Sequence, residues 1–184
     1  MTPRPLRTLL VDNRDSFTCN LEHLLARATG TPPVVLRHDR LPEMQPEAHD
    51  LVVISPGPGA PEEYPGYGRV IDSRVPVLGI CLGMQILNMH FGGVTAPLDG
   101  CVHGKTDTAL FDDGRTFTVA RYHSLHVVTP GEGLRVCART PAGLVMALRH
   151  ESRPLMGYQF HPESFLTPDG VTLIHHALHT LRLR

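Results

Sequence analysis

The sequence predicts a single α/β domain over residues 1–184, with parallel strands in its first half and hairpin-like strands in its second half. Strand and helix patterns alternate up to about residue 93, which is typical of parallel strands joined by crossover helices. From about residue 94, short β-rich runs follow one another between turn residues, and one helical pattern comes last. A chain of 184 residues can bury a core without disulfides or metals.

The first half of the chain alternates between short apolar runs and amphipathic stretches. Ser16 is placed to cap a helix over 17–28, in which apolar residues recur at helical spacing. A second helix is expected directly after Cys81 and should close at Gly92 and Gly93. The strands expected in this half are 7–12, 34–38, 51–55 and 76–80.

The second half contains short runs rich in β-branched and apolar residues. A final helix is expected over 171–182, and His175, His176 and His179 are expected on its solvated face. No glutamate or cysteine completes a zinc ligand set beside them, so no metal is predicted. The strands expected here are 115–121, 125–129, 134–139, 144–149 and 155–160.

The composition excludes several classes of protein. Lys and Arg number 17 against 18 Asp and Glu, without basic runs, so nucleic acid is not an expected partner. No apolar run approaches the roughly 18 residues of a membrane span, and the N-terminal apolar stretch is too short for a secretory signal. We therefore expect a cytoplasmic protein. Its cysteines, Cys19, Cys81, Cys101 and Cys137, form no CxxC pair, so free and mostly buried thiols are expected.

The segment Gly79-Ile80-Cys81-Leu82-Gly83 has the pattern of a nucleophile elbow, because it follows an apolar run and opens a helical pattern. Glycines are needed on both sides, since such a turn brings strand and helix backbones close together. The N–H groups at a helix start can also stabilise negative charge. Taken alone, the pattern fits a buried structural cysteine equally well.

A cysteine nucleophile needs a base, and His161 with Glu163 is the best candidate pair. The two residues lie two apart at the end of the predicted strand 155–160, so an extended backbone would point both side chains the same way. Glu163 could then orient the imidazole and stabilise its charged form. An exposed His and Glu at a strand end is the alternative, but the presence of the elbow in the same chain favours a catalytic pair.

Two glycine-containing loops complete the set of candidate motifs. In Ser55-Pro56-Gly57-Pro58-Gly59-Ala60-Pro61 the N–H groups of Gly57 and Gly59 are unshielded, which suits an oxyanion or a carboxylate. The loop lacks GxGxxG spacing, so a dinucleotide site is not predicted. The segment 100–106, GCVHGKT, has three residues between its glycines where a P-loop has four, so a nucleotide site is not predicted there either.

Together these motifs resemble those of the triad-type (class I) glutamine amidotransferases, and more narrowly the glutaminase components of anthranilate synthase and of aminodeoxychorismate synthase. The resemblance covers about residues 8–170. It implies an open three-layer α/β/α fold with a central, mostly parallel mixed sheet. It also implies release of ammonia from L-glutamine for a partner synthase. The motifs occur in the order DNRDSFTCN, SPGPGAP, GICLGMQ, HGKT, RYHSL and GYQFHPES.

The resemblance implies roles for individual residues. Cys81 would be the nucleophile, His161 the general base and acid, and Glu163 the carboxylate that orients it. The backbone N–H groups of Gly57 and Leu82 would form the oxyanion hole. No cofactor is expected. The glutamine pocket would be lined by Gly57, Gly59, Gln85, Ser124 and Leu125.

The chain departs from the family pattern at a few positions. Arg14 and Cys19 stand where tyrosine is usual, and Met84 stands where many anthranilate relatives have histidine. The stretch between His103 and Arg121 is shorter than in many relatives. Arg14, Cys19 and this short stretch could alter how a partner docks.

The expected protein partner is a chorismate-using synthase, because 184 residues leave no room for an acceptor domain and free ammonia would escape into water. Our first hypothesis is that the chain serves the tryptophan pathway as component II of anthranilate synthase. The para-aminobenzoate branch of folate synthesis, or service to both pathways, is the alternative. The rival functions are a γ-glutamyl peptidase, which would share the triad, and a non-catalytic scaffold, against which an intact triad argues.

Overall fold

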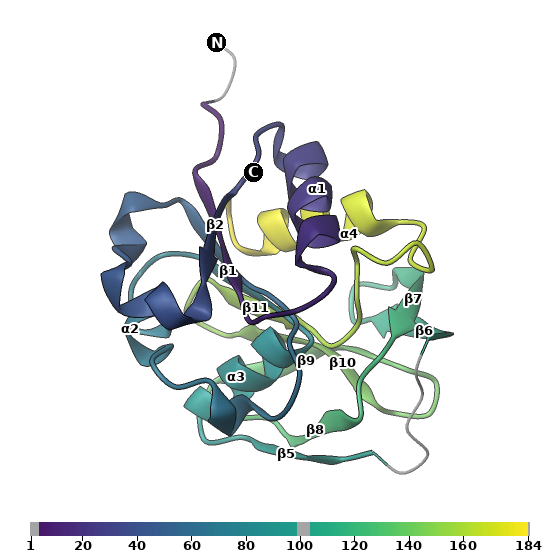
Figure 1. Cartoon of the computed structure of the whole chain (residues 1–184). Coiled ribbons are helices and arrows are strands. Elements are labelled where there is room, and N and C mark those ends of the chain that lie inside the picture. The colour runs from purple at the N-terminus through teal and green to yellow at the C-terminus, as the bar shows by residue number, and fades with distance from the viewer. Residues whose placement is uncertain (1–3, 99–103, 184) are drawn as a thin grey trace.

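Within residues 4–98 and 104–183, which the computed structural model describes, nine strands form one mixed sheet (Figure 1). The strands from β2 to β11 run parallel, and each later neighbour is antiparallel. Their spatial order is β2 (Val34–Arg37), β1 (Thr8–Asp12), β3 (Leu51–Ile54), β4 (Val77–Ile80), β11 (Leu155–Tyr158), β10 (Val145–His150), β9 (Leu134–Arg139), β6 (Lys105–Phe111) and β7 (Thr116–Arg121).

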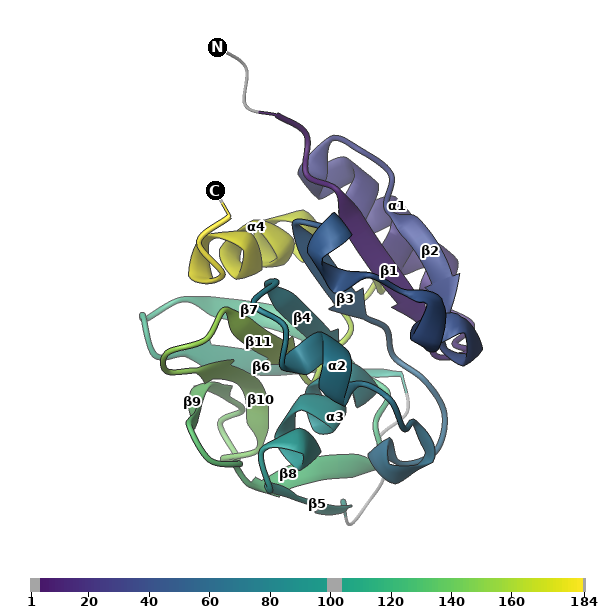
Figure 2. The same ribbon diagram turned by 90° about the vertical axis from the view of Figure 1, so that its left-hand side faces the viewer.

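Helices cover both faces of this sheet, as the resemblance implied. Helices α1 (Thr18–Thr29) and α4 (Gly170–Thr180) pack side by side on one face (Figures 1 and 2). Helices α2 (Gly68–Ile71) and α3 (Leu82–His90) lie on the other face (Figure 2). None of the helices in the described part of the chain is long and apolar enough to cross a bilayer.

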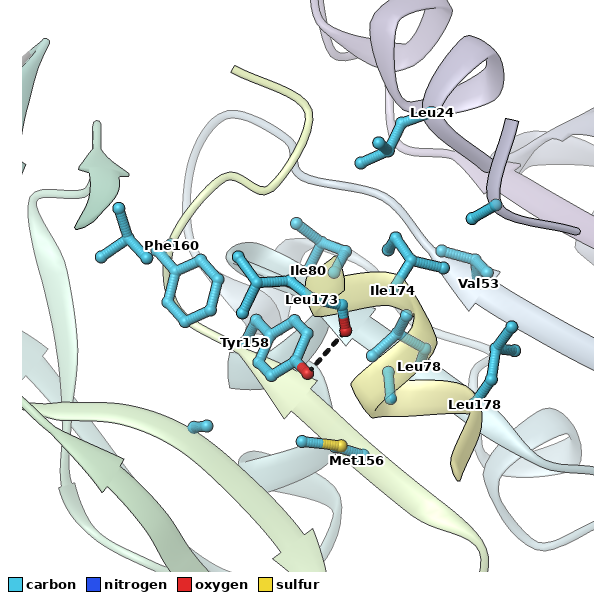
Figure 3. Packing of buried hydrophobic residues seen from close by; sticks show 14 of the residues in the cluster. Leu24, Val53, Leu78, Ile80, Met156, Tyr158, Phe160, Leu173, Ile174 and Leu178 are labelled. Atoms are coloured by element: carbon cyan, nitrogen blue, oxygen red, sulfur yellow. Dashed lines mark hydrogen bonds between the residues drawn. The ribbon is translucent and has the colours of Figure 1, made fainter. Parts of the chain in front are cut away.

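The core follows from the alternation of side chains along the central strands. On β4, Leu78 and Ile80 pack with α1 and α4, whereas Val77 faces the cluster on the α3 side. Tyr158 on β11 is fully buried, stacks on Phe160 with ring centroids 4.7 Å apart, and donates a hydrogen bond to the Leu173 carbonyl (Figure 3). Because β3 and β4 are covered on both faces, they are apolar throughout, and this made them predictable.

The predicted strands and long helices are all present, but the sequence reading missed two strands. Strand β6 begins with exposed polar residues, so it lacks the apolar alternation of a buried strand. Strand β5 (Val94–Pro97) is also largely exposed, and it pairs with β8 (Leu125–Thr129) in a separate two-stranded sheet beside α3 (Figure 1). The second half therefore contains hairpins, as predicted, but β8 lies outside the main sheet.

The prediction that Ser16 caps the first helix is wrong. Helix α1 begins at Thr18, the residue before it is Phe17, and no side chain caps its first turn. The Thr18 hydroxyl instead donates to Asp12 Oδ1 at 2.7 Å, which ties the start of the helix to the end of β1.

The histidines of the last helix are not all solvated. His175 and His179 are exposed, as predicted, but His176 is buried and its Nδ1 lies 2.7 Å from the Tyr158 hydroxyl. Of the cysteines, Cys19 is exposed, Cys81 and Cys137 are buried, and these three are free thiols. Cys101 and the glycine-rich segment up to residue 103 lie outside the described residues.

Candidate active site

Cys81 occupies the turn between β4 and α3 with φ 51° and ψ −103°. A positive φ is costly for a residue with a Cβ and persists only where surrounding structure enforces it. The backbone N–H of Cys81 donates to the Tyr158 carbonyl at 2.6 Å, and its own carbonyl accepts from the N–H of Gln85 at 3.2 Å. The predicted elbow geometry is therefore present, and the residue is 7% exposed.

The glycines around Cys81 allow strand and helix to approach closely. A Cβ on Gly79 would lie 2.7 Å from the backbone nitrogen of Met84 and closer still to the main chain of Gly83. A Cβ on Gly83 would collide with the carbonyl oxygen of Ile54 on β3. Main-chain atoms cannot move aside as a flexible side chain can, so both positions require glycine.

His161 and Glu163 form a buried pair beside this elbow. Glu163 Oε1 lies 2.7 Å from His161 Nδ1, which leaves Nε2 as the nitrogen available for chemistry. His161 N donates to the Ala120 carbonyl at 3.1 Å, which fixes the backbone against β7. The ring is contacted by Tyr122 and Phe17, with centroids 5.1 and 6.0 Å away.

The reason given for this pairing was wrong, although the pair itself is present. The chain is not extended through Glu163, because β11 ends at Tyr158 and residues 161–164 form a turn in which Ser164 N donates to the His161 carbonyl. The Thr167 hydroxyl donates to the same carbonyl at 2.7 Å. The turn, and not strand alternation, brings the carboxylate to Nδ1.

Electrostatics favour a charged imidazole at this position. Burial lowers the pKa of His161, but the negative charges available on Cys81 and Glu163 more than offset this, so the pKa lies well above its ordinary value. Cys81 is thus close enough to His161 to interact with it as a charged partner. Among the residues that the structure describes, none forms a hydrogen bond with Nε2 that would compete with this interaction.

One cavity of about 190 Å³ opens beside the Cys81 side chain. It gathers every residue that the resemblance assigned to the oxyanion hole and to the glutamine pocket. These residues are Gly57, Gly59, Leu82, Gln85, Ser124 and Leu125, and the sequence reading did not anticipate Pro58, Tyr122 and His123, which also line the cavity. A larger cavity of about 450 Å³ lies between α1 and residues 162–172, but no cysteine lines it.

Asn13 holds the proline-glycine loop and was missed by the sequence reading. It is fully buried, its Nδ2 donates to the Ser55 carbonyl at 2.9 Å, and its N–H donates to Ser55 Oγ at 2.9 Å. A Cβ on Gly57 would lie 2.8 Å from Asn13 Cβ and 2.7 Å from a Leu82 methyl group. Gly57 is therefore held between Asn13 and Leu82, next to the start of α3. Parallel strands end at one edge of a sheet, so the DNRDS and SPGPG loops after neighbouring strands could have signalled this contact.

His123 is a second residue that the sequence reading missed. Its Nδ1 lies 2.8 Å from the Leu125 carbonyl, and Arg121 Nε donates to its Nε2 at 3.3 Å. Burial lowers the pKa of His123 to about 4, and the Arg121 cation adds to this effect. The ring is therefore neutral near pH 7, with its proton on Nδ1 facing the carbonyl.

Comparison with known proteins decides the family. The model of the class-I glutamine amidotransferases matches residues 9–181. The chain belongs to this family. Aminodeoxychorismate synthase from Streptomyces griseus is 43% identical over 183 residues, covering 92% of this chain and 25% of that protein. Anthranilate synthase component 2 from Thermus thermophilus is 41% identical over 186 residues, covering 92% and 90%.

The fold of this amidotransferase chain also matches a solved structure. A crystal structure of a GMP synthase-type protein from Thermoplasma acidophilum superposes with a TM-score of 0.84. The match covers 98% of this chain and 96% of the other at 22% identity, so it establishes the shared α/β fold. The chain spans a quarter to a half of the length of several relatives, including the Streptomyces protein and a multifunctional tryptophan biosynthesis protein from Pichia angusta.

Proposed function

We propose that this amidotransferase chain hydrolyses L-glutamine and supplies the ammonia to a chorismate-using synthase, as the glutaminase component of anthranilate synthase. The observation that carries the proposal is the position of Cys81. Its strained turn faces a cavity lined by the unshielded loop at Gly57 and Gly59, next to a buried His161–Glu163 pair. This set of groups is what acyl transfer from an amide requires.

The first half-reaction uses Cys81 as the nucleophile. Its sulfur attacks the side-chain amide carbon of glutamine, and the N–H groups of Gly57 and Leu82 hold the oxyanion of the tetrahedral intermediate. His161 Nε2 gives a proton to the departing nitrogen, the C–N bond breaks, and ammonia leaves a γ-glutamyl thioester on Cys81. Glu163 keeps Nδ1 protonated, so that Nε2 is the nitrogen that exchanges the proton.

The second half-reaction regenerates the thiol. A water molecule loses a proton to His161 Nε2 and attacks the thioester carbon, forming a second oxyanion in the same hole. The C–S bond then breaks, glutamate leaves, and the proton on His161 returns to the sulfur. The oxygen and one hydrogen of water end in glutamate, and the other hydrogen replaces the thiol proton that left with ammonia.

The partner and pathway are supported by the names of relatives. Anthranilate synthase component 2 from Thermus thermophilus matches this chain along nearly its whole length. The Streptomyces griseus relative is an aminodeoxychorismate synthase, which keeps the para-aminobenzoate branch as the second candidate. Delivery through a channel to a docked synthase follows from chemistry, since ammonia released into water is protonated and lost. A reducing compartment such as the cytoplasm suits the free thiols.

A reconstituted assay tests the proposal. The chain is combined with each candidate synthase, L-glutamine and chorismate, and the aromatic product is identified. Anthranilate, with the amino group ortho to the carboxylate, supports the first candidate. A para product after lyase treatment supports the folate branch. Glutamine hydrolysis should disappear in Cys81→Ala and persist in the matched control Cys19→Ala, whose thiol is exposed and outside the cavity. Hydrolysis of γ-glutamyl peptides without any synthase would instead favour a peptidase.

A further inference from the structure

Gln159 contacts the sulfur of Cys81 and takes no part in the two half-reactions. It follows β11 directly, is fully buried, and its backbone N–H donates to the Met146 carbonyl at 2.9 Å. Its side-chain Nε2 lies 3.6 Å from Cys81 Sγ, within hydrogen-bonding distance for sulfur. The contact joins residues that are 78 positions apart in the sequence.

The direction of the Gln159 amide is fixed by a chain of hydrogen bonds that starts at a backbone carbonyl. The Leu125 carbonyl can only accept, so it turns the amino group of Gln85 toward itself at 3.2 Å. The same amino group donates to Gln159 Oε1 at 3.2 Å. Because Oε1 of Gln159 then faces Gln85, its amino group must face the sulfur.

A purely structural reading of Gln159 leaves its amino group unexplained. A buried side-chain amide needs partners for both ends, and Gln85 satisfies only the oxygen. Within the described part of the chain, Cys81 Sγ is the acceptor for the amino group. An N–H donor aimed at sulfur favours the negatively charged form over the neutral thiol and limits rotation about the Cα–Cβ bond of Cys81.

We infer that Gln159 is a positioning residue that holds the Cys81 sulfur in its reactive orientation and supports its negative charge through an N–H···S hydrogen bond oriented by Gln85. The inference rests on the proposed function of Cys81 as nucleophile. Gln159 does not line the cavity, so it acts on the sulfur and not on glutamine.

Two substitutions test this role with little change of shape. Gln159→Met removes the donor, and Gln159→Glu places an oxygen where the amino group was. We expect kcat for glutamine to fall about tenfold in Gln159→Met and about 100-fold in Gln159→Glu, with KM changed by less than about threefold. Gln45→Met is the matched control, because Gln45 is exposed and distant from the cavity.

The decisive readout is alkylation of Cys81 by iodoacetamide across a pH series, followed on the Cys81 peptide by mass spectrometry. We expect this profile to show slower alkylation at neutral pH in Gln159→Met and slower still in Gln159→Glu, because each variant removes the N–H donor that supports the charged sulfur. Unchanged profiles in both variants would overturn the inference. If Gln159→Met does not fold, the profile of Gln159→Glu decides alone. If neither folds, alkylation of Cys81 in Gln85→Met decides: this variant lacks the donor that orients Gln159, and we expect slower alkylation in it.

This test separates the inference from the proposed function. Alkylation needs neither glutamine nor a synthase, so a shifted profile supports the Gln159 contact even if the chain hydrolyses no glutamine. A wild-type chain that is inactive with every synthase would refute the proposed function alone. An active wild type with unchanged alkylation profiles in the variants would refute the role of Gln159 alone.

Discussion

Acidification should destabilise the fold through His123, which is buried as a neutral ring between Arg121 and the Leu125 carbonyl. A proton added at Nε2 would face the Arg121 guanidinium, so the folded state resists it. The pKa of His123 is lowered from 6.5 to about 4 on folding. Between pH 6.5 and about 4, His123 is therefore protonated in the unfolded chain but neutral in the folded chain. The free energy of unfolding must then fall as the pH falls.

The size of the effect follows from the two pKa values. Above pH 6.5 both states are neutral at this position, and the full stability is present. From pH 7 to pH 5 the unfolded state gains about 2 kcal/mol from protonation of this one side chain, at about 1.4 kcal/mol per pH unit. The loss continues until the pH passes below about 4, where the folded state also takes up the proton.

Urea unfolding of the wild type and of His123→Gln at pH 7, 6 and 5 measures this loss of stability. Other titrating groups, including His176, are present in both proteins and cancel in the difference. We expect the wild type to lose about 2 kcal/mol more than His123→Gln between pH 7 and pH 5. His23→Gln, which replaces an exposed histidine, is the matched control. Parallel slopes for wild type and His123→Gln would refute the assignment of a neutral, buried His123.

Three further changes test the elbow, the loop and the triad. Gly79→Ala adds a methyl group against the main chain of α3 and should lower the free energy of unfolding in urea by about 3 kcal/mol. The control Gly114→Ala, where φ is +86° but no atom lies near the added methyl group, should lower it by about 1 kcal/mol, and equal losses would contradict the steric argument. Asn13→Ala removes the buried amide that holds the loop, and it should lower kcat for glutamine about tenfold and the free energy of unfolding by about 2 kcal/mol. An unchanged kcat would show that Asn13 does not support the oxyanion hole. Glu163→Gln lacks the carboxylate that keeps the proton on His161 Nδ1, so ammonia release in single-turnover assays should fall about 1000-fold while the protein stays folded. A reduction of less than about tenfold would exclude the role of Glu163 in orienting His161.

The parts of the fold that the sequence predicted are those in which burial controls residue type. Strands β3 and β4 are buried on both faces and consist of uninterrupted apolar residues, so their position and their parallel pairing could be inferred. The glycines around Cys81 were equally informative, because a backbone contact tolerates no other residue. Strand β6 and the small sheet of β5 with β8 were harder, since their side chains are largely exposed.

The supporting residues of the site could not be inferred for a different reason. Asn13 and Gln159 matter through contacts with residues far along the chain, and single sequence positions do not reveal such contacts. The hydrogen-bond partners of His123 lie only two positions away, but its burial depends on how the loops pack. The His161–Glu163 pair was found from spacing, yet the spacing argument assumed an extended strand where the chain forms a turn. Local patterns thus indicated the candidate reactive groups, while the groups that orient them depend on strand order and loop packing.

The central claim is that the Cys81 sulfur attacks the side-chain amide of bound glutamine. A diazo-ketone analogue of L-glutamine, which alkylates only a nucleophile correctly placed in a glutamine pocket, tests it directly by peptide mapping. We expect one adduct, on the Cys81 peptide, that excess L-glutamine prevents and that Glu163→Gln forms more slowly. Modification of the exposed Cys19 instead, or labelling of Cys81 that glutamine does not slow, would contradict it.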